Sequence, residues 1–511
     1  MNKIYQSYYT HSEPIVDYMI KKLCPQKGLK FLEPSVGDGV FISALEHFLP
    51  FIDIDAFDLN PDSIEKLKRK YKQQENIKFK NIDTLLDRDL AMYSNFGGLY
   101  DRIIANPPYG AWQDYEKRKL LKKRFKGLYV KETYTLFLYQ CIELLKVNGR
   151  LVFIIPDTFL NLHMHKQLRG YLLKSTKIDE ICIFPSSFFP KVSFGYSKLC
   201  IISLQKGSTS SENLSNNFVV RTDFKNVGNL VNPDGEKKYF FSQKDVFKNI
   251  DSALFISDDP EITSIINNAN IRTGDVADCV TGIYSGNDKD FLYAKNHSVK
   301  NSKKYKIVDI ENISEKLPPL NGLSSKKCFV PIMKGGAVKF VKPSQWFIDW
   351  SIEAVTHYKT DKKARFQNSQ YYFKNGVGVP MVSSARISAA LINNRLFDQS
   401  IVGIFPKDEK YTLYLLAFFN SGMCNKLIRT INPTANNPAN YIKKIPFIEP
   451  EPDALEKINK LTAGIIGKIS ANPKTDLKNL ISQIDRVFEE IYLKRKTDKS
   501  NSPSRNGDRT V

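Results

Sequence analysis

The stretch FLEPSVGDG, residues 31–39, decides the fold. An apolar run that begins at Leu29 ends at Glu33, a glycine-rich turn follows, and apolar residues then recur at helical spacing from Phe41 to Phe48. A strand that leads through a turn into a helix is typical of a β-α-β unit. Glycine is needed where a Cβ would clash, so this turn lets a ligand approach the backbone closely. Alone it is a weak signal, because a glycine turn also serves simple chain reversal.

The alternation of strand and helix continues outward from this turn to about Leu204. Six strands are expected, at residues 29–33, 52–58, 77–80, 100–105, 151–155 and 178–184. A second helix is indicated by the apolar stripe of Phe137, Cys141, Leu144 and Leu145. The pattern predicts an α/β domain over residues 1–205 with a mixed, mainly parallel sheet.

Composition changes after this domain. Residues 206–217, KGSTSSENLSNN, are small and polar and are expected to form a linker. Short strand-like runs with Gly, Asn and Pro turns fill residues 218–450 and predict a second, mixed α/β domain. A helical region at 451–493 and a disordered tail at 494–511 are expected to follow.

Charge and cysteine content narrow the class of protein. The 511 residues include 75 Lys and Arg against 54 Asp and Glu, a net charge of +21, which favours a polyanionic partner. The longest apolar run, residues 151–155, is far shorter than the roughly 20 residues of a membrane span, and the N-terminus has no apolar signal core. Seven cysteines without a C-x-x-C pair argue against disulfides and zinc. We therefore expect a cytoplasmic protein with no metal site.

Two further motifs add chemistry to the glycine turn. Asp58 ends the next strand about 20 residues on, where a carboxylate can hold ribose hydroxyls, although a solvated strand-end Asp would look the same. The turn lacks the G-x-G-x-x-G spacing of dinucleotide enzymes, which argues against NAD.

The second motif is Asn106-Pro107-Pro108-Tyr109, at the end of the strand 100–105. Asn106 and Pro107 both precede prolines and are held extended, so the Asn106 amide oxygen and the Pro107 carbonyl point outward as acceptors. Two convergent acceptors suit the amino group of a planar heterocycle or an amide, and Tyr109 can stack on the ring. A rigid turn that merely stops a strand is the less favoured interpretation.

These motifs, in this order, resemble the gamma class of adenine-N6 DNA methyltransferases, the TaqI-like N(4)/N(6)-methyltransferase family of bacterial restriction-modification systems. The resemblance covers residues 1–205 and continues more loosely to about residue 450. It implies a Rossmann-like class I methyltransferase domain followed by a target-recognition domain. It also implies methyl transfer from S-adenosyl-L-methionine to a flipped-out adenine of double-stranded DNA, by a monomer. A cognate restriction endonuclease would be a separate protein.

The resemblance assigns roles to residues of this chain. It implies catalysis by Asn106, Pro107 and Tyr109, and stacking of the target base on Tyr109 and Phe189. It implies that twelve residues bind the cofactor: Tyr9, Thr10, Glu33, Ser35, Gly37, Gly39, Asp58, Leu59, Asp83, Thr84, Asn106 and Phe137.

DNA contacts are expected from cations, aromatics and amides of both domains. The basic run EKRKLLKKRFK, residues 116–126, follows the catalytic turn and is either a solvated helix face or a phosphate contact. Base-edge readers are usually Arg, Lys, Asn and Gln. The candidates are Lys122, Lys123, Arg124, Lys334, Tyr371, Lys374, Arg386 and Asn436.

Three rival functions remain open. A protein-glutamine N5 methyltransferase would also present an amino group to an Asn-Pro-Pro-Tyr turn, but it would resemble only the first ~200 residues. The modification subunit of a multi-subunit restriction complex would carry a long helical region before the turn, which here begins by Glu33. A non-catalytic DNA-binding protein would have no need for Asp58 and the intact Asn106–Tyr109 turn.

Overall fold

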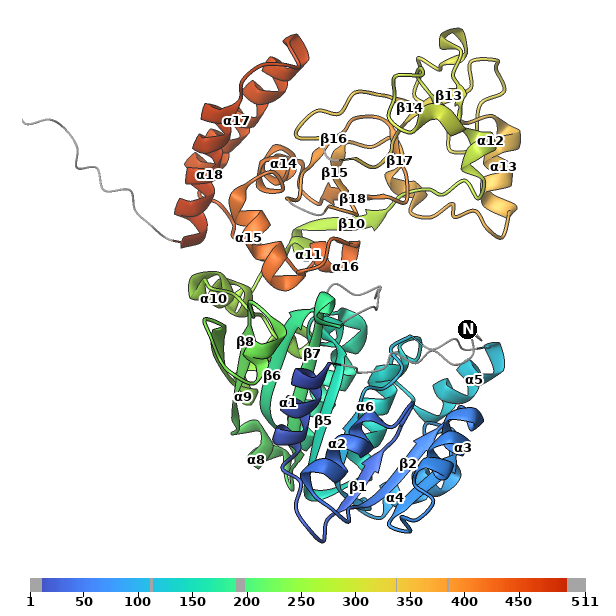
Figure 1. Ribbon diagram of the computed structural model, residues 1–511. Coiled ribbons are helices and arrows are strands. Elements are labelled where there is room, and N and C mark those ends of the chain that lie inside the picture. The colour runs from blue at the N-terminus through green and yellow to red at the C-terminus, as the bar shows by residue number, and fades with distance from the viewer. Residues whose placement is uncertain (1–11, 111–113, 190–197, 337, 384–385, 494–511) are drawn as a thin grey trace, which may run out of the picture. The chain divides into compact units, whose positions relative to one another are not determined.

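The computed structural model describes residues 12–110, 114–189, 198–336, 338–383 and 386–493 (Figure 1). The chain divides into two units, Met1–Ile256 and Ser257–Val511. Within the described residues, no helix is both long enough and apolar enough to cross a membrane.

A nine-stranded sheet forms the centre of the first unit. Its strand order is β3-β2-β1-β4-β5-β7-β6-β8-β9. The first five strands in this order, β3-β2-β1-β4-β5, are parallel to one another, as are β6 and β8. Strands β7 and β9 run antiparallel to their neighbours. The strands are β1 (Lys30–Glu33), β2 (Asp53–Asp58), β3 (Ile77–Asn81), β4 (Tyr100–Ala105), β5 (Leu145–Pro156), β6 (Thr176–Pro185), β7 (Lys198–Lys206), β8 (Asn217–Thr222) and β9 (Lys237–Ser242).

Helices cover both faces of this sheet, since the consecutive β4 residues Ile103, Ile104 and Ala105 are all fully buried. The α-helices are α1 (Glu13–Leu23), α2 (Val40–Phe48), α3 (Pro61–Lys70), α4 (Arg88–Asn95), α5 (Tyr115–Arg124), α6 (Thr133–Leu144), α7 (Lys166–Ser175), α8 (Ser210–Leu214) and α9 (Gln243–Lys248). Short 3-10 turns are η1 (Asp157–Leu160), η2 (His163–His165), η3 (Ser186–Phe188), η4 (Val227–Leu230) and η5 (Ile250–Ser252). The mixed, mainly parallel sheet and its six expected strands are confirmed, as are the helices predicted from the stripes at Phe41 and Phe137.

The boundary between the units differs from the expected linker at 206–217. That segment contains the end of β7, the helix α8 and the start of β8, and β8 and β9 extend the same sheet. Its polar side chains make specific bonds: Asn213 Nδ2 donates to the Lys174 carbonyl at 2.8 Å, and Asn216 Nδ2 donates to the Ile178 carbonyl at 2.8 Å. Small polar residues here pin a turn to the sheet, so the division falls after Ile256 instead.

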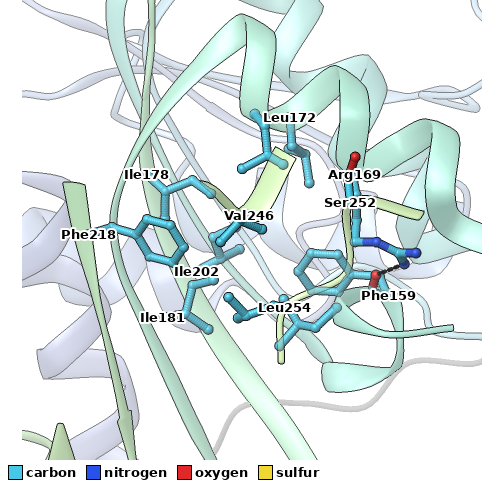
Figure 2. Close-up of a pocket in the computed structure, with 12 residues that line it drawn as sticks. Phe159, Arg169, Leu172, Ile178, Ile181, Ile202, Phe218, Val246, Ser252 and Leu254 are labelled. Atoms are coloured by element: carbon cyan, nitrogen blue, oxygen red, sulfur yellow. Dashed lines mark hydrogen bonds between the residues drawn. The ribbon is translucent and has the colours of Figure 1, made fainter. Parts of the chain in front are cut away.

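A small cavity lies inside the first unit between the sheet and α7 (Figure 2). Its volume is about 20 Å³, which is room for about one water molecule. Figure 2 shows apolar side chains such as Ile181, Ile202 and Phe218 around it, and the Arg169 guanidinium turned to the Phe159 carbonyl, 2.6 Å away. The cavity is too small and too apolar for a substrate site.

The second unit holds two smaller sheets. Strands β10 (Ala277–Thr281), β18 (Ile401–Pro406), β15 (Gly376–Pro380) and β16 (Ala390–Ile392) form an antiparallel sheet in that order. The second sheet runs β12 (Lys306–Ile307), β11 (Leu292–Ala294), β14 (Trp346–Asp349), β13 (Phe329–Met333) and β17 (Leu396–Phe397). A core around Trp350 and Phe397 lies beside it.

Short helices connect these strands, and two long ones follow them. The α-helices are α10 (Pro260–Asn268), α11 (Thr273–Val276), α12 (Asp288–Phe291), α13 (Ile352–Thr360), α14 (Thr412–Phe418), α15 (Gly422–Ile431), α16 (Ala439–Ile442), α17 (Pro452–Ala471) and α18 (Lys478–Leu493). The 3-10 turns are η6 (Ser302–Lys304), η7 (Ile310–Asn312), η8 (Ser369–Tyr371) and η9 (Glu409–Tyr411). The helical region expected at 451–493 corresponds to α17 and α18, whereas the tail 494–511 lies outside the described residues.

Candidate active site

The glycine turn between β1 and α2 is held against β2. Gly37 and Gly39 have φ angles of 56° and 82°, in the left-handed region that favours glycine. A Cβ on Gly39 would lie 2.7 Å from Leu67 Cδ2, so a larger residue would require the Leu67 side chain of α3 to shift. The Val36 N–H donates to the Phe57 carbonyl at 2.8 Å, which fastens the turn to the neighbouring strand. The left-handed glycines and the bond to Phe57 therefore fix the backbone path of the turn.

Asp58 at the end of β2 completes this fastening. Its Oδ2 accepts from the Gly37 N–H and its Oδ1 from the Asn60 N–H, both at 2.8 Å. A carboxylate offers about four lone-pair positions, so these two bonds leave acceptor capacity for a hydroxyl group. Burial raises the pKa of Asp58, and the backbone N–H groups oppose that shift. Asp58 thus shapes the turn as well as offering acceptors.

Glu33 lies buried at the end of β1 and is the most perturbed acid of the site. Burial, followed by the charges of Asp38 and Asp58, raises its pKa well above the ordinary value. Glu33 Oε2 and Ser35 Oγ are both buried, and neither has a hydrogen-bond partner within the described part of the chain. A cationic ligand that donates hydrogen bonds would satisfy these atoms and relieve the concentrated negative charge. The ammonium group of S-adenosylmethionine fits this requirement, and the sulfonium group adds positive charge without donating a hydrogen bond.

The loop after β3 carries Asp83 and Thr84, whose environments differ. Asp83 Oδ2 accepts from Lys117 Nζ on α5 at 2.7 Å, and its Oδ1 accepts from the Leu85 N–H at 3.0 Å. The buried Thr84 hydroxyl donates to the Pro34 carbonyl at 2.7 Å. Thr84 therefore stabilises the glycine turn through Pro34. Its hydroxyl hydrogen is used in this bond and cannot be donated to a cofactor at the same time.

Leu59 and Phe137 are the apolar candidates for the cofactor. Leu59 is 42 % exposed directly after Asp58, whereas Phe137 is buried on α6. A cavity of about 480 Å³ opens between α1 and α2 and is lined by Asp17, Asp38 and Gly39 among others. Its volume falls in the range of small-molecule sites, although it touches only Gly39 among the predicted cofactor residues that the structure describes. Tyr9 and Thr10 lie outside the described residues.

The Asn106–Tyr109 turn follows β4, the neighbour of β1 in the sheet. Asn106 is partly exposed, and the Tyr109 ring is only 1 % exposed. The Thr133 hydroxyl, at the start of α6, donates to the Pro108 carbonyl at 2.6 Å. Tyr109 packs edge-on against Tyr134, with ring centroids 6.4 Å apart. Thr133 and Tyr134 thus brace the turn, although the sequence offered only the helical stripe of α6 as a signal for them.

Tyr134 extends this support to the end of β5, since its Oη lies 2.8 Å from Thr158 Oγ1. The neighbouring residue Asp157 is largely buried, and burial raises its pKa to about 6. The ends of β4 and β5 are adjacent in the sheet, so Asp157 lies at the same edge of the sheet as the Asn106–Tyr109 turn.

Phe189, the aromatic expected to stack on the target base, follows η3 after β6. Its ring is 2 % exposed, and its N–H donates to the Ser186 carbonyl at 3.1 Å. The adjacent Phe188 is less buried and stacks on Phe184 at 5.8 Å. Because Tyr109 and Phe189 are both buried here, stacking on a base requires their rings to be uncovered first.

The expected DNA contacts on α5 fall into two groups. Lys122 and Lys123 are exposed, in keeping with phosphate contact. Arg124 is partly buried and donates to the Asp87 carbonyl at 2.8 Å and to Gln140 Oε1 at 3.3 Å. Arg124 therefore docks α5 onto α4 and α6, because its guanidinium lies on the inward face of the helix with Lys117.

The second-unit candidates also differ from one another. Lys334 Nζ lies 2.9 Å from Asp288 Oδ2 and 3.5 Å from Asp398 Oδ2, so its charge is neutralised internally. Tyr371 donates to Asp278 Oδ2 at 2.6 Å and stacks on Phe405. The three exposed candidates are Lys374, Arg386 and Asn436.

Comparison with solved structures supports the fold. The chain is similar to a nuclease-deletion mutant of the type ISP restriction-modification enzyme LlaGI, determined in complex with a DNA substrate mimic. The TM-score is 0.57 at 13 % identity, over 91 % of this chain and 55 % of that one. The first unit is an α/β domain with a mixed, mainly parallel sheet, the fold that the sequence predicts.

Comparison with protein sequences shows similarity to restriction-modification methylases over part of the chain. Residues 40–189 match the family model described as Eco57I restriction-modification methylase. The type II methyltransferase M.AccI of Acinetobacter calcoaceticus is 36 % identical over 176 residues, 33 % of this chain and 31 % of that protein. M.HindII of Haemophilus influenzae is 27 % identical over 305 residues, 54 % of this chain and 53 % of that protein. The adenine-specific methyltransferase BrxX of Escherichia coli is 24 % identical over 369 residues, 68 % of this chain and 28 % of that protein.

Over residues 40–189 the chain is therefore similar to the Eco57I restriction-modification methylases, in agreement with the resemblance to restriction-modification methylases seen in the sequence. The matched region covers about a third of the length of M.AccI and about half of the length of M.HindII.

Proposed function

We propose that this chain is a sequence-specific DNA adenine methyltransferase. It transfers a methyl group from S-adenosylmethionine to N6 of a flipped-out adenine in double-stranded DNA, as the protective enzyme of a restriction-modification system. The observation that carries this proposal is the Asn106–Tyr109 turn, braced by Thr133 at 2.6 Å beside the acidic glycine turn of the neighbouring strand. The family of residues 40–189 supports it.

The catalytic turn acts on the amino group through its acceptors. Asn106 Oδ1 and the Pro107 carbonyl accept the two N–H bonds of the adenine amino group, which favours a pyramidal nitrogen with an available lone pair. With the cofactor bound, the nitrogen would attack the methyl carbon directly. The N–C bond would form as the S–C bond breaks, S-adenosylhomocysteine would leave, and the surplus proton of the nitrogen would pass to water. Holding the reactants in place contributes up to roughly 7–11 kcal/mol toward the barrier, so no strong general base is required.

The cofactor site would be built from the acidic strand ends. S-adenosylmethionine, when bound, supplies an electrophilic methyl group. Glu33 would accept from its ammonium group, Asp58 from the ribose hydroxyls, and Asp83 from the adenine amino group. Leu59, exposed after Asp58, would cover the adenine face. Each of these side chains lies in or directly after a β-strand end on one edge of the sheet.

The substrate is a polyanion whose target base lies inside a duplex. A net charge of +21 and the exposed Lys122 and Lys123 favour phosphate binding. Extrusion of a base costs a few kcal/mol, and stacking on Tyr109 and Phe189 returns about 1–3 kcal/mol per base. We place the protein in the bacterial cytoplasm with its DNA, as a monomer, with any cognate endonuclease as a separate protein.

The test is to express the chain in a bacterial host that lacks adenine methylation and to map modified bases across the genome. N6-methyladenine at one short recurring sequence is expected, and Asn106→Ala should abolish it while retaining cofactor binding. Unmethylated DNA together with methylated glutamine in a host protein would instead favour the protein-glutamine methyltransferase. Near-normal methylation by Asn106→Ala would remove the turn from catalysis.

A further inference from the structure

We propose that two paired loops of the second unit, residues 381–383 and 432–437, read base edges in the DNA major groove through Asn436 and Val382. We call these residues the loop pair. This inference rests on the proposed function, since it assumes that duplex DNA is the substrate, and it names the element that selects the sequence.

The loop pair joins segments that lie far apart in the sequence. The Ser383 N–H donates to the Ala435 carbonyl at 2.8 Å, and the Asn437 N–H donates to the Met381 carbonyl at 2.6 Å. Val382 and Asn436 lie directly opposite each other in this antiparallel bridge. Opposed residues of an antiparallel pair present their side chains to the same face. Val382 is 69 % exposed and Asn436 is exposed as well, so the two form one short outward edge.

A buried polar network fixes the loop pair from behind. Asn432 is fully buried; its Nδ2 donates to the Asn436 carbonyl at 2.8 Å, and its Oδ1 accepts from the Thr434 hydroxyl at 2.8 Å.

Arg429 on α15 spans both loops, with Nη1 donating to the Thr434 carbonyl and Nη2 to the Ser383 carbonyl, each at 2.7 Å. Such a loop loses little freedom on binding, which is the condition for selective recognition.

The chemistry of the exposed edge fits bases better than phosphates. Neither segment contains a charged residue, so the edge adds no sequence-independent attraction to the backbone. The major groove admits a two-stranded ribbon, an Asn amide pairs with adenine N6 and N7, and an aliphatic side chain contacts the thymine methyl group. Asn436 and Val382 together therefore match adenine–thymine steps.

Asn436 can be changed without disturbing this scaffold, because the bonds that hold it run through its backbone carbonyl. Asn436→Ala and Val382→Ser should be compared with Asn393→Ala, an exposed asparagine in the turn between β16 and β17 of the same unit. The measurement is the methylated sequence across a genome, with rates on oligonucleotides that differ at one position. Thermal melting of each variant shows that it is folded.

Asn436→Ala should relax the recognised sequence at one position, with discrimination there falling by roughly 5- to 150-fold, while Asn393→Ala keeps the full site. Val382→Ser should relax an adjacent position. An unchanged site in Asn436→Ala, or an equal loss of methylation at every sequence, would overturn the inference. If the wild-type chain methylates no DNA, it is the proposed function that fails, so the two failures are distinct.

Discussion

Lys117 Nζ lies 2.7 Å from Asp83 Oδ2, so a cation of the helix after the catalytic turn neutralises the carboxylate assigned to the cofactor's adenine. Arg124 lies two turns further along α5 and donates a hydrogen bond to the carbonyl of Asp87, in the loop that also carries Asp83. The helix is thus docked at two points onto the loop that carries Asp83, while Lys122 and Lys123 remain exposed on its other face. A DNA contact on α5 would therefore be mechanically linked to the cofactor site.

Lys117→Met should weaken cofactor binding, because Asp83 loses the partner that orients it. Both side chains are about three-quarters buried, and a loss of ~1 kcal/mol, about fivefold in the dissociation constant, is expected. Lys119→Met, on the exposed face of the same helix, should leave the constant unchanged. Calorimetric titration with S-adenosylmethionine measures both. Tighter binding by Lys117→Met would mean that the lysine competes with the cofactor.

Asp58→Ala should impair both the cofactor site and the turn. A charged hydrogen bond contributes roughly 1.5–3 kcal/mol, so the cofactor dissociation constant should rise by one to two orders of magnitude. The melting temperature should also fall, since the Gly37 and Asn60 N–H groups lose their acceptor. Calorimetry and thermal melting separate the two effects. An unchanged dissociation constant would exclude Asp58 from the cofactor site.

Thr133→Val should lower turnover while sparing cofactor affinity. The variant keeps the side-chain shape but removes the hydroxyl that donates to the Pro108 carbonyl, so the catalytic turn is less firmly placed. A small misplacement of reacting groups is costly, and a loss of about tenfold or more in kcat is expected. The matched control is Thr135→Val on the same helix, whose hydroxyl bonds the Glu132 carbonyl at 2.8 Å. Equal losses in both variants would point to α6 stability alone.

Asp157 should make stability depend on pH between about 4 and 6. Burial raises its pKa to about 6, above the unfolded value, so the folded state binds the extra proton in this interval. The free energy of unfolding should therefore decrease as pH rises through it, by up to about 3 kcal/mol, and level off above pH 6.

Asp157→Asn removes this titration, so the variant should gain stability relative to wild type at pH 7 and little at pH 4. Chemical denaturation at the two pH values measures the difference. A constant difference would show that the carboxyl does not titrate in that range.

Phe189→Ala should disturb base extrusion. A 2-aminopurine at the target position should brighten when wild-type protein binds, because the base leaves the stack. Loss of the Phe189 ring should reduce methylation by about 5- to 150-fold, the equivalent of ~1–3 kcal/mol of stacking. Phe188→Ala is the matched control, since that ring stacks on Phe184 instead. The reverse ranking of the two variants would move the stacking role to Phe188.

The fold of the first unit and the outline of its site follow from local sequence patterns. Strand and helix periodicity around residues 31–39 locates the glycine turn, because side-chain spacing reports backbone geometry directly. The prolines after Asn106 restrict the backbone whatever surrounds them, so that turn was also recognisable. The net charge predicts a polyanionic partner, because it can be counted from the sequence without a three-dimensional structure.

Only the tertiary structure decided which of these residues meet. The Lys117–Asp83 pair, the Thr133 bond to Pro108 and the Val382–Asn436 bridge each join residues 25 to 54 positions apart, and no local pattern encodes such a contact. The composition of the polar segment 206–217 predicts a linker, because composition carries no information about Lys174 and Ile178, the distant partners that bind the segment to the sheet. Arg124 and Lys334 are likewise predicted to contact DNA, because the sequence does not show the internal partners that bind their charged groups. Local sequence sets backbone preference, whereas the partner of a polar side chain is chosen by the packing of distant elements.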